Sequence, residues 1–178
     1  IHQESIVKVM TELINRVAAS SIVSLNMEEF YPQEERILFD LAAYLEQGLV
    51  LREKEFRAAL KAKDWQGVEG MWVAVSCSAD AIVPTWAFML VCTYLEGKAR
   101  GYCVGDLEAL EQYIVEETLS KLPLESFKDR SVVVKGCSKV AIPLFAYGRL
   151  VSLLQREAKS LLFGEPCSTV PLYKKGKS

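Results

Sequence analysis

Short apolar runs alternate with segments of helical periodicity along the second part of the chain. These runs and segments follow one another as 73–76, 84–95, 99–104, 107–119, 132–135, 143–157 and 160–163. Runs that are apolar throughout indicate strands buried on both faces, and helices of about a dozen residues between them indicate parallel βαβ units with right-handed crossovers. The pattern therefore predicts a three-layer α/β fold with a mostly parallel sheet of four or more strands.

The first 70 residues carry a less regular pattern. Helical spacing of apolar residues predicts a helix over 5–19, and short strands are predicted at 22–25 and 49–51. A charged amphipathic helix is predicted over 52–63, and the acidic stretch 27–35 is predicted to be a solvated loop. We expect residues 1–70 to form a small α+β annex to the parallel α/β unit 71–178, within one compact domain. Because Met10 is a candidate initiator, residues 1–9 are expected to be upstream sequence.

Three strand-like runs lead into a Cys-Ser pair that is followed by Val-Pro or Ile-Pro. The three segments are MWVAVSCSADAIVP (71–84), SVVVKGCSKVAIP (131–143) and SLLFGEPCSTVP (160–171). Ligands of open parallel sheets bind just beyond the carboxyl ends of the strands. The thiols of Cys77, Cys137 and Cys167 are therefore expected at one edge of the sheet.

Several polar residues accompany these thiols in the sequence. Asp106 follows the strand-like run 99–104 at the equivalent point, and Asp80 is a candidate turn cap or a general base beside Cys77. The Cys-Ser hydroxyls are candidate turn or cap groups ahead of helices that start at a proline. The candidate ligand-binding residues are Ser78, Asp80, Asp106, Ser138 and Ser168.

Four interpretations of the cysteines stay open. Three thiolates could hold an iron–sulfur cluster, or zinc completed by Asp106 or water. A thiol of lowered pKa could act as a nucleophile or redox group, or the loop backbone could bind an anion or nucleotide. The cysteines could also be packed as small hydrophobic residues. Our first hypothesis is a metal or iron–sulfur centre. The alternatives are a non-catalytic module that binds a small molecule or a protein partner, with structural cysteines, and a thiol-redox protein.

Composition narrows the classes of function without defining a reaction. The 178 residues carry a formal net charge of −2, which predicts no nucleic-acid surface. The longest apolar stretch, 79–95, is interrupted by Asp80 and Pro84 and is shorter than the roughly 20 apolar residues of a membrane span. We expect a cytoplasmic protein with reduced cysteines. The single histidine, His2, argues against a Ser-His-Asp triad and a histidine-rich metal site.

Four segments of the sequence resemble a bacterial family, found mainly in Bacteroidetes, that is catalogued as a domain of unknown function. They are FYPQEERILFDL, VSCSADAIVPTWAFML, VVVKGCS and FGEPCSTVPLYKK. The resemblance extends from about Met10 to Lys175. It implies a small soluble cytoplasmic protein, and it implies no activity, substrate or cofactor.

Overall fold

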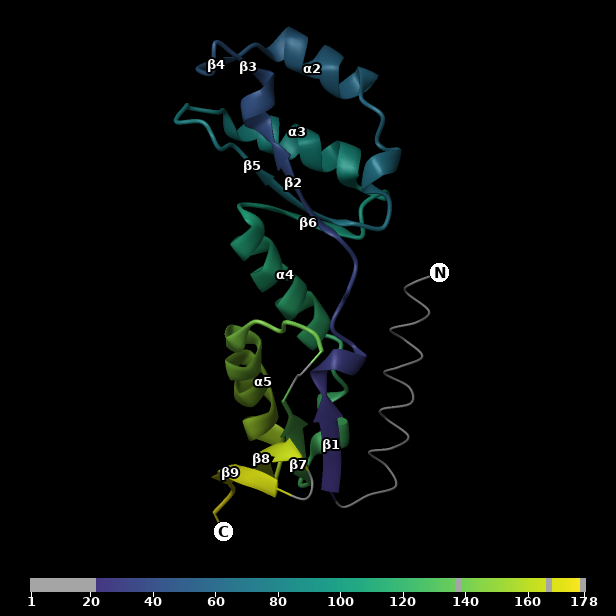
Figure 1. Ribbon diagram of the computed structural model, residues 1–178, viewed down its shortest axis with the longest axis vertical. Helices are drawn as coiled ribbons and strands as arrows, with labels where there is room; N and C mark the ends of the chain where they lie inside the picture. Colours follow the sequence, from purple (N-terminus) through teal and green to yellow (C-terminus); the bar gives the residue numbers. More distant parts are fainter. Residues whose placement is uncertain (1–21, 137–138, 166–167, 177–178) are drawn as a thin grey trace. The chain divides into compact units, whose positions relative to one another are not determined.

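The computed structural model describes residues 22–136, 139–165 and 168–176 (Figure 1). The chain forms two compact units. Unit 2 consists of Gln33–Ile114, and unit 1 consists of the described residues up to Pro32 together with those from Val115 onward. The boundaries thus fall after Pro32 and Ile114, whereas the sequence pattern places a boundary after residue 70.

Unit 2 is built on a sheet of three parallel strands in the order β2–β5–β6. The strands are β2 (Arg36–Asp40), β5 (Trp72–Ser76) and β6 (Gly101–Val104), and helix α3 (Thr85–Leu95) connects β5 to β6. The segment between β2 and β5 contains η2 (Leu41–Tyr44), the antiparallel hairpin β3 (Leu45–Glu46) and β4 (Val50–Leu51), α2 (Glu53–Ala62) and η3 (Gln66–Val68).

Central strand β5 is covered on both faces, as its uniformly apolar sequence predicts. Val73 and Val75 belong to one buried cluster with Phe56 of α2 and with the buried residues of α3. The indole of Trp72, in the same strand, packs edge-to-face against Tyr113 of α4 (Leu107–Leu119), with ring centroids 6.0 Å apart. Burial on both faces is the environment that parallel strands require.

Unit 1 contains a four-stranded sheet in the order β1–β7–β8–β9. The strands are β1 (Ile22–Asn26), β7 (Ser131–Lys135), β8 (Ser160–Glu165) and β9 (Ser168–Lys174). The first three are parallel, and β9 is antiparallel to β8. Helix α5 (Leu144–Glu157) connects β7 to β8, and the short helices are η1 (Met27–Glu29) and η4 (Leu124–Phe127).

The predicted α/β class, with mostly parallel strands and helical crossovers, is confirmed. The strands are divided over two sheets, one in each unit. Three strands were not expected, namely β2, the two-residue β3 and β9. β9 includes the last residues of the third Cys-Ser-Pro segment. Its Pro171 lies at an irregularity in the pairing with β8. Proline is tolerated there because edge strands leave half of their N–H groups outside the ladder. The predicted helix over 5–19 lies outside the described residues.

The two units repeat one strand–loop–helix–strand arrangement at a constant separation along the chain. Trp72 pairs with Gly101 between β5 and β6, and the equivalent Ser131 pairs with Ser160 between β7 and β8. The inward-facing helix positions correspond one to one and are fully buried: Ala87, Val91 and Leu95 in α3, and Ala146, Leu150 and Leu154 in α5. Each residue of this segment in one unit can therefore be assigned an equivalent residue in the other unit.

Turns at both ends of the repeat match as well. Before the central strand, Gly70 (φ 72°) and the equivalent Asp129 (φ 56°) both adopt left-handed backbone conformations. After the last strand, Gly105 (φ 150°) corresponds to Gly164 (φ 123°). In this register, the position equivalent to Cys77 is Gly136. The Cys-Ser pairs at 77 and 137 are therefore matched by motif but offset by one residue relative to their strands.

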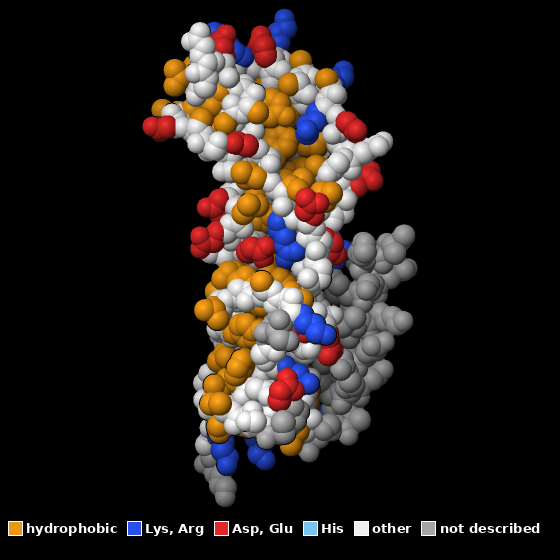
Figure 2. Space-filling view, in the orientation of Figure 1, with side chains coloured by type: hydrophobic (Ala, Val, Ile, Leu, Met, Phe, Trp, Pro, Cys, Tyr) orange, Lys and Arg blue, Asp and Glu red, His pale blue; other side chains and the backbone are white. Residues whose placement is uncertain are grey.

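Each unit exposes hydrophobic side chains beside the loop that precedes its crossover helix. Ile82 is 95% exposed in unit 2, and Leu144, the first residue of α5, is 86% exposed in unit 1. Figure 2 shows hydrophobic side chains gathered over α3 and over α5. Exposed apolar groups of this kind are typical of binding surfaces.

Candidate functional site

Asp40 fixes the Cys-Ser loop of unit 2 to the neighbouring strand. It ends β2 in register with Ser76, the last residue of β5. Its Oδ1 accepts the backbone N–H of Ser78 (3.0 Å) and of Ala42 (2.9 Å), and its Oδ2 accepts the Ser78 hydroxyl (2.5 Å). The hydroxyl of Ser78, followed by these two N–H groups, lowers the pKa of the Asp40 carboxyl. The carboxylate thus holds the loop through two hydrogen bonds to Ser78, while the third, from Ala42, caps η2.

A pocket of about 340 Å³ lies beyond the carboxyl ends of β5 and β6. Its lining includes the loop residues Cys77, Ala79, Ala81 and Val83, Phe88 of α3, and Val104 of β6. The pocket is at the edge of the sheet where parallel α/β folds bind their ligands. Because Asp40 anchors the loop, this part of the pocket wall is held in place without a ligand.

The remaining polar groups at this edge mostly hold the backbone. Asp106 caps α4, since its Oδ1 accepts the N–H of Ala109 at 2.8 Å. The Cys77 Sγ is half-buried and donates a weak hydrogen bond to the Ala79 carbonyl oxygen at 3.8 Å. Asp80 lies exposed in the same loop.

A similar anchor is present in unit 1. The side chain of Asn26, at the end of β1, accepts the N–H of Glu28 at 3.2 Å. Glu28 Oε1 accepts the N–H of Lys139, in the loop after β7, at 2.8 Å. In both units a carboxylate at the end of the first strand or just beyond it therefore fixes the loop after the second strand: Asp40 ends β2, and Glu28 lies in η1 after β1. Asp40 and Glu28 were not among the predicted site residues, although the Asn/Asp at each strand end is a visible signal.

The three-thiol site stays a prediction. Cys137, Ser138 and Cys167 lie outside the described residues, and Ser168 is the exposed first residue of β9. Within the described ranges, no group of three or more His, Cys, Asp or Glu side chains could hold a metal ion. The structure therefore adds no support for zinc or an iron–sulfur cluster.

The other two described cysteines are half-buried in regular structure. Cys92 lies in α3 and Cys103 in β6. Burial raises the pKa of both thiols, and the carboxylate of Asp106 adds to the effect at Cys103. Both are consistent with packed, unreactive side chains.

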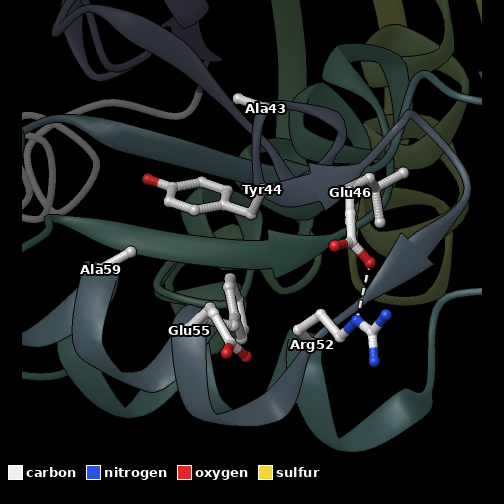
Figure 3. Close-up of a pocket in the computed structure, with 8 residues that line it drawn as sticks. Ala43, Tyr44, Glu46, Arg52, Glu55 and Ala59 are labelled. Atoms are coloured by element: carbon white, nitrogen blue, oxygen red, sulfur yellow. Dashed lines mark hydrogen bonds and ion pairs between the residues drawn. The ribbon is translucent and has the colours of Figure 1, made fainter.

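A second hollow of unit 2, about 490 Å³, lies between α2 and the β3–β4 hairpin (Figure 3). Tyr44 and Phe56 form its aromatic wall, with ring centroids 5.3 Å apart, and burial raises the pKa of Tyr44. The Arg52 guanidinium donates to Glu46 Oε2 at 2.7 Å. Both ion-pair side chains are more than half exposed, and exposed pairs contribute little to stability or binding.

The described part of the chain contains no helix long and apolar enough to cross a membrane. The cytoplasmic location and the lack of a nucleic-acid partner stay predictions.

The fold and the site define an α/β protein with two repeated units, in which an anchored loop borders a pocket at the strand ends. The family model described as "Protein of unknown function (DUF2480)" matches residues 11–175, so the chain belongs to this family. This confirms the resemblance to a family of unknown function. The searches of curated proteins and of solved structures gave no match.

Proposed function

We propose that the protein is a non-catalytic binding module whose strand-end pocket in unit 2 holds a small, largely apolar molecule. The observation that carries this proposal is the pocket beyond β5 and β6, bordered by a loop that Asp40 anchors. Its volume of about 340 Å³ is at the lower end of the range for small-molecule sites.

The lining defines the chemistry of the ligand. Val83, Phe88 and Val104 offer apolar contact, while Cys77 adds a thiol. Polar recognition falls mainly to backbone groups of the loop. This combination suits a molecule with a compact hydrocarbon body and one or two hydrogen-bonding groups.

The hydrogen bonds at this edge favour binding over acid–base chemistry. The Asp40 carboxylate accepts three hydrogen bonds and the Asp106 carboxylate caps α4. Both groups are used to hold main-chain segments. A general base instead needs access to a substrate proton.

The proposal is tested by NMR titration with benzyl alcohol and with its saturated counterpart, cyclohexylmethanol. We expect either probe to cause saturable shifts in the backbone amides of Cys77, Ala79 and Gly105, which lie at the pocket. Ala81→Trp places an indole in the pocket and should weaken binding by at least about tenfold. Ala58→Trp adds the same side chain at an exposed position of α2 and serves as the matched control.

Two outcomes would overturn the proposal. One is the lack of saturable shifts at these amides up to the solubility limit of both probes. The other is equal affinity for the parent protein and a folded Ala81→Trp variant.

A further inference from the structure

We infer that unit 1 contains a second binding site, equivalent in position to the pocket of unit 2, and that this site selects a planar aromatic group. The inference extends the proposed function to a second site on separate residues. It can therefore hold or fail independently of the first site.

The two units form a pocket at the same place in the repeat. In unit 1 the pocket has a volume of about 500 Å³. Five of its lining positions are Gly136, Val140, Ile142, Tyr147 and Phe163. Their equivalents in the repeat register are Cys77, Ala81, Val83, Phe88 and Val104, all of which line the pocket of unit 2. Two pockets at matched positions indicate a feature of the fold rather than an accidental gap.

The two pockets differ in how one pair of facing positions is filled. A Cβ added to Gly136 would lie 3.0 Å from Cζ of Phe163, which is closer than side chains normally approach. In unit 2 the equivalent pair is Cys77 and the smaller Val104. Compared with unit 2, unit 1 therefore has a smaller residue at the loop position (Gly136) and a larger side chain at the strand position (Phe163). As a result, unit 1 has an aromatic ring in its wall where unit 2 has a thiol.

The rings in unit 1 are placed to receive a third ring. Tyr147 and Phe163 pack edge-to-face, with centroids 6.1 Å apart and an interplanar angle of 84°. A planar guest can therefore stack on one of them while its edge meets the other, which are the two favoured geometries of aromatic pairs. Val140, Ile142 and Leu144 supply the aliphatic part of the wall. This apolar lining favours an uncharged aromatic group over an anion or cation.

The titration with benzyl alcohol and cyclohexylmethanol also tests this inference, because the amides of Gly136 and Phe163 report on unit 1 in the same spectra. We expect benzyl alcohol to bind at these amides about fivefold more tightly than the saturated alcohol. Phe163→Val copies the unit 2 residue and should remove most of this preference. Val140→Trp should block the site, whereas Ala81→Trp, its equivalent in unit 2, should leave it unchanged.

Three results would overturn the inference. They are a lack of saturable shifts at Gly136 and Phe163, equal affinity of unit 1 for both alcohols, and loss of the unit 1 shifts in a folded Ala81→Trp variant. Failure of the proposed function would instead be seen at the amides of Cys77, Ala79 and Gly105 in unit 2. Phe163 is 39% exposed, so its truncation leaves most of the core intact.

Discussion

The carboxylate of Asp40 accepts both the backbone N–H and the hydroxyl of Ser78, although the two residues lie 38 positions apart in the sequence. Asp40 belongs to an outer strand of the sheet, and Ser78 belongs to the loop that follows the central strand. This contact fixes one wall of the proposed binding pocket. It makes the loop geometry depend on a residue outside the pocket.

Asp40→Ala should destabilise unit 2 and loosen the loop. The substitution removes the acceptor of three hydrogen bonds, so we expect the free energy of unfolding to fall by about 1–2 kcal/mol. Hydrogen exchange at the amides of Ser78 and Ala42 should become faster. Ser78→Ala is the matched control: it removes only the hydroxyl contact and should have a smaller effect. Unchanged exchange in the Asp40→Ala variant would contradict the anchoring role.

Stability should depend on pH through the same carboxyl group. The pKa of Asp40 is lowered in the folded protein, so the unfolded state binds the proton more tightly. Its contribution is present in full above the unfolded-state pKa of about 4 and is lost as the pH falls through the lower folded-state pKa. The difference in unfolding free energy between the parent and Asp40→Asn should therefore shrink below about pH 4. Denaturant titrations of both proteins between acidic and neutral pH measure this difference. A difference in unfolding free energy that does not change with pH would contradict the prediction.

Tyr102 should ionise only in strongly alkaline solution. Its hydroxyl donates to Glu96 Oε2 at 2.5 Å, and this hydrogen bond, with smaller effects of burial and charge, raises the pKa of Tyr102 to about 12. The contact stabilises the fold below the unfolded pKa of about 10 and is lost as the pH rises through the folded value. Ultraviolet titration of tyrosinate should show Glu96→Gln bringing this transition back toward pH 10. A parent whose tyrosinate titration coincides with that of Glu96→Gln would disprove the assignment.

Two glycines of unit 1 should respond in opposite directions to substitution by alanine. Gly164 has a φ of 123°, and an added Cβ would lie 2.6 Å from the carbonyl oxygen of Ser168 in β9. Gly164→Ala should cost more than about 1 kcal/mol of unfolding free energy. Gly148 lies inside α5 with open space at its Cβ position, so Gly148→Ala should stabilise by about 0.5–1 kcal/mol. Thermal and chemical denaturation measure both effects, and the same sign for both would refute this interpretation.

Replacement of Cys77 offers a direct test of the three-thiol hypothesis. The Cys77 thiol lines the pocket proposed to bind a small apolar molecule and donates to a carbonyl oxygen. We therefore expect Cys77→Ala, purified without oxygen, to keep the same metal and acid-labile sulfide content as the parent. Stoichiometric iron or zinc in the parent that disappears in Cys77→Ala would support the metal site instead.

The crossover helices could be predicted from sequence because their signals are local. The predicted range of α4 matches Leu107–Leu119, and α3 and α5 begin one residue after Pro84 and Pro143. Both prolines act as N-caps rather than as first helical residues. Apolar periodicity and a proline at the start are contained within each segment, so no distant partner is needed to recognise them.

The strands β2 and β9 and the anchor of the loop depend on distant partners. β2 is an outer strand whose stretch, Arg36–Asp40, mixes polar and apolar residues, and β9 is defined by its pairing with β8. The Cys-Ser motif also suggested a wrong correspondence between the loops, because side-chain identity does not fix strand register. Only the pairing of Trp72 with Gly101, and of Ser131 with Ser160, shows that Gly136 stands where Cys77 does.

The constant spacing between the two strand–loop–helix–strand segments has an evolutionary consequence. Strand, loop, helix and final glycine keep one spacing from Met71 to Gly105 and from Arg130 to Gly164, without an inserted or deleted residue. Such a pattern is what tandem duplication of an ancestral gene segment leaves behind. After duplication, each copy was free to diverge, and the exchange of Cys77 and Val104 for Gly136 and Phe163 records that divergence.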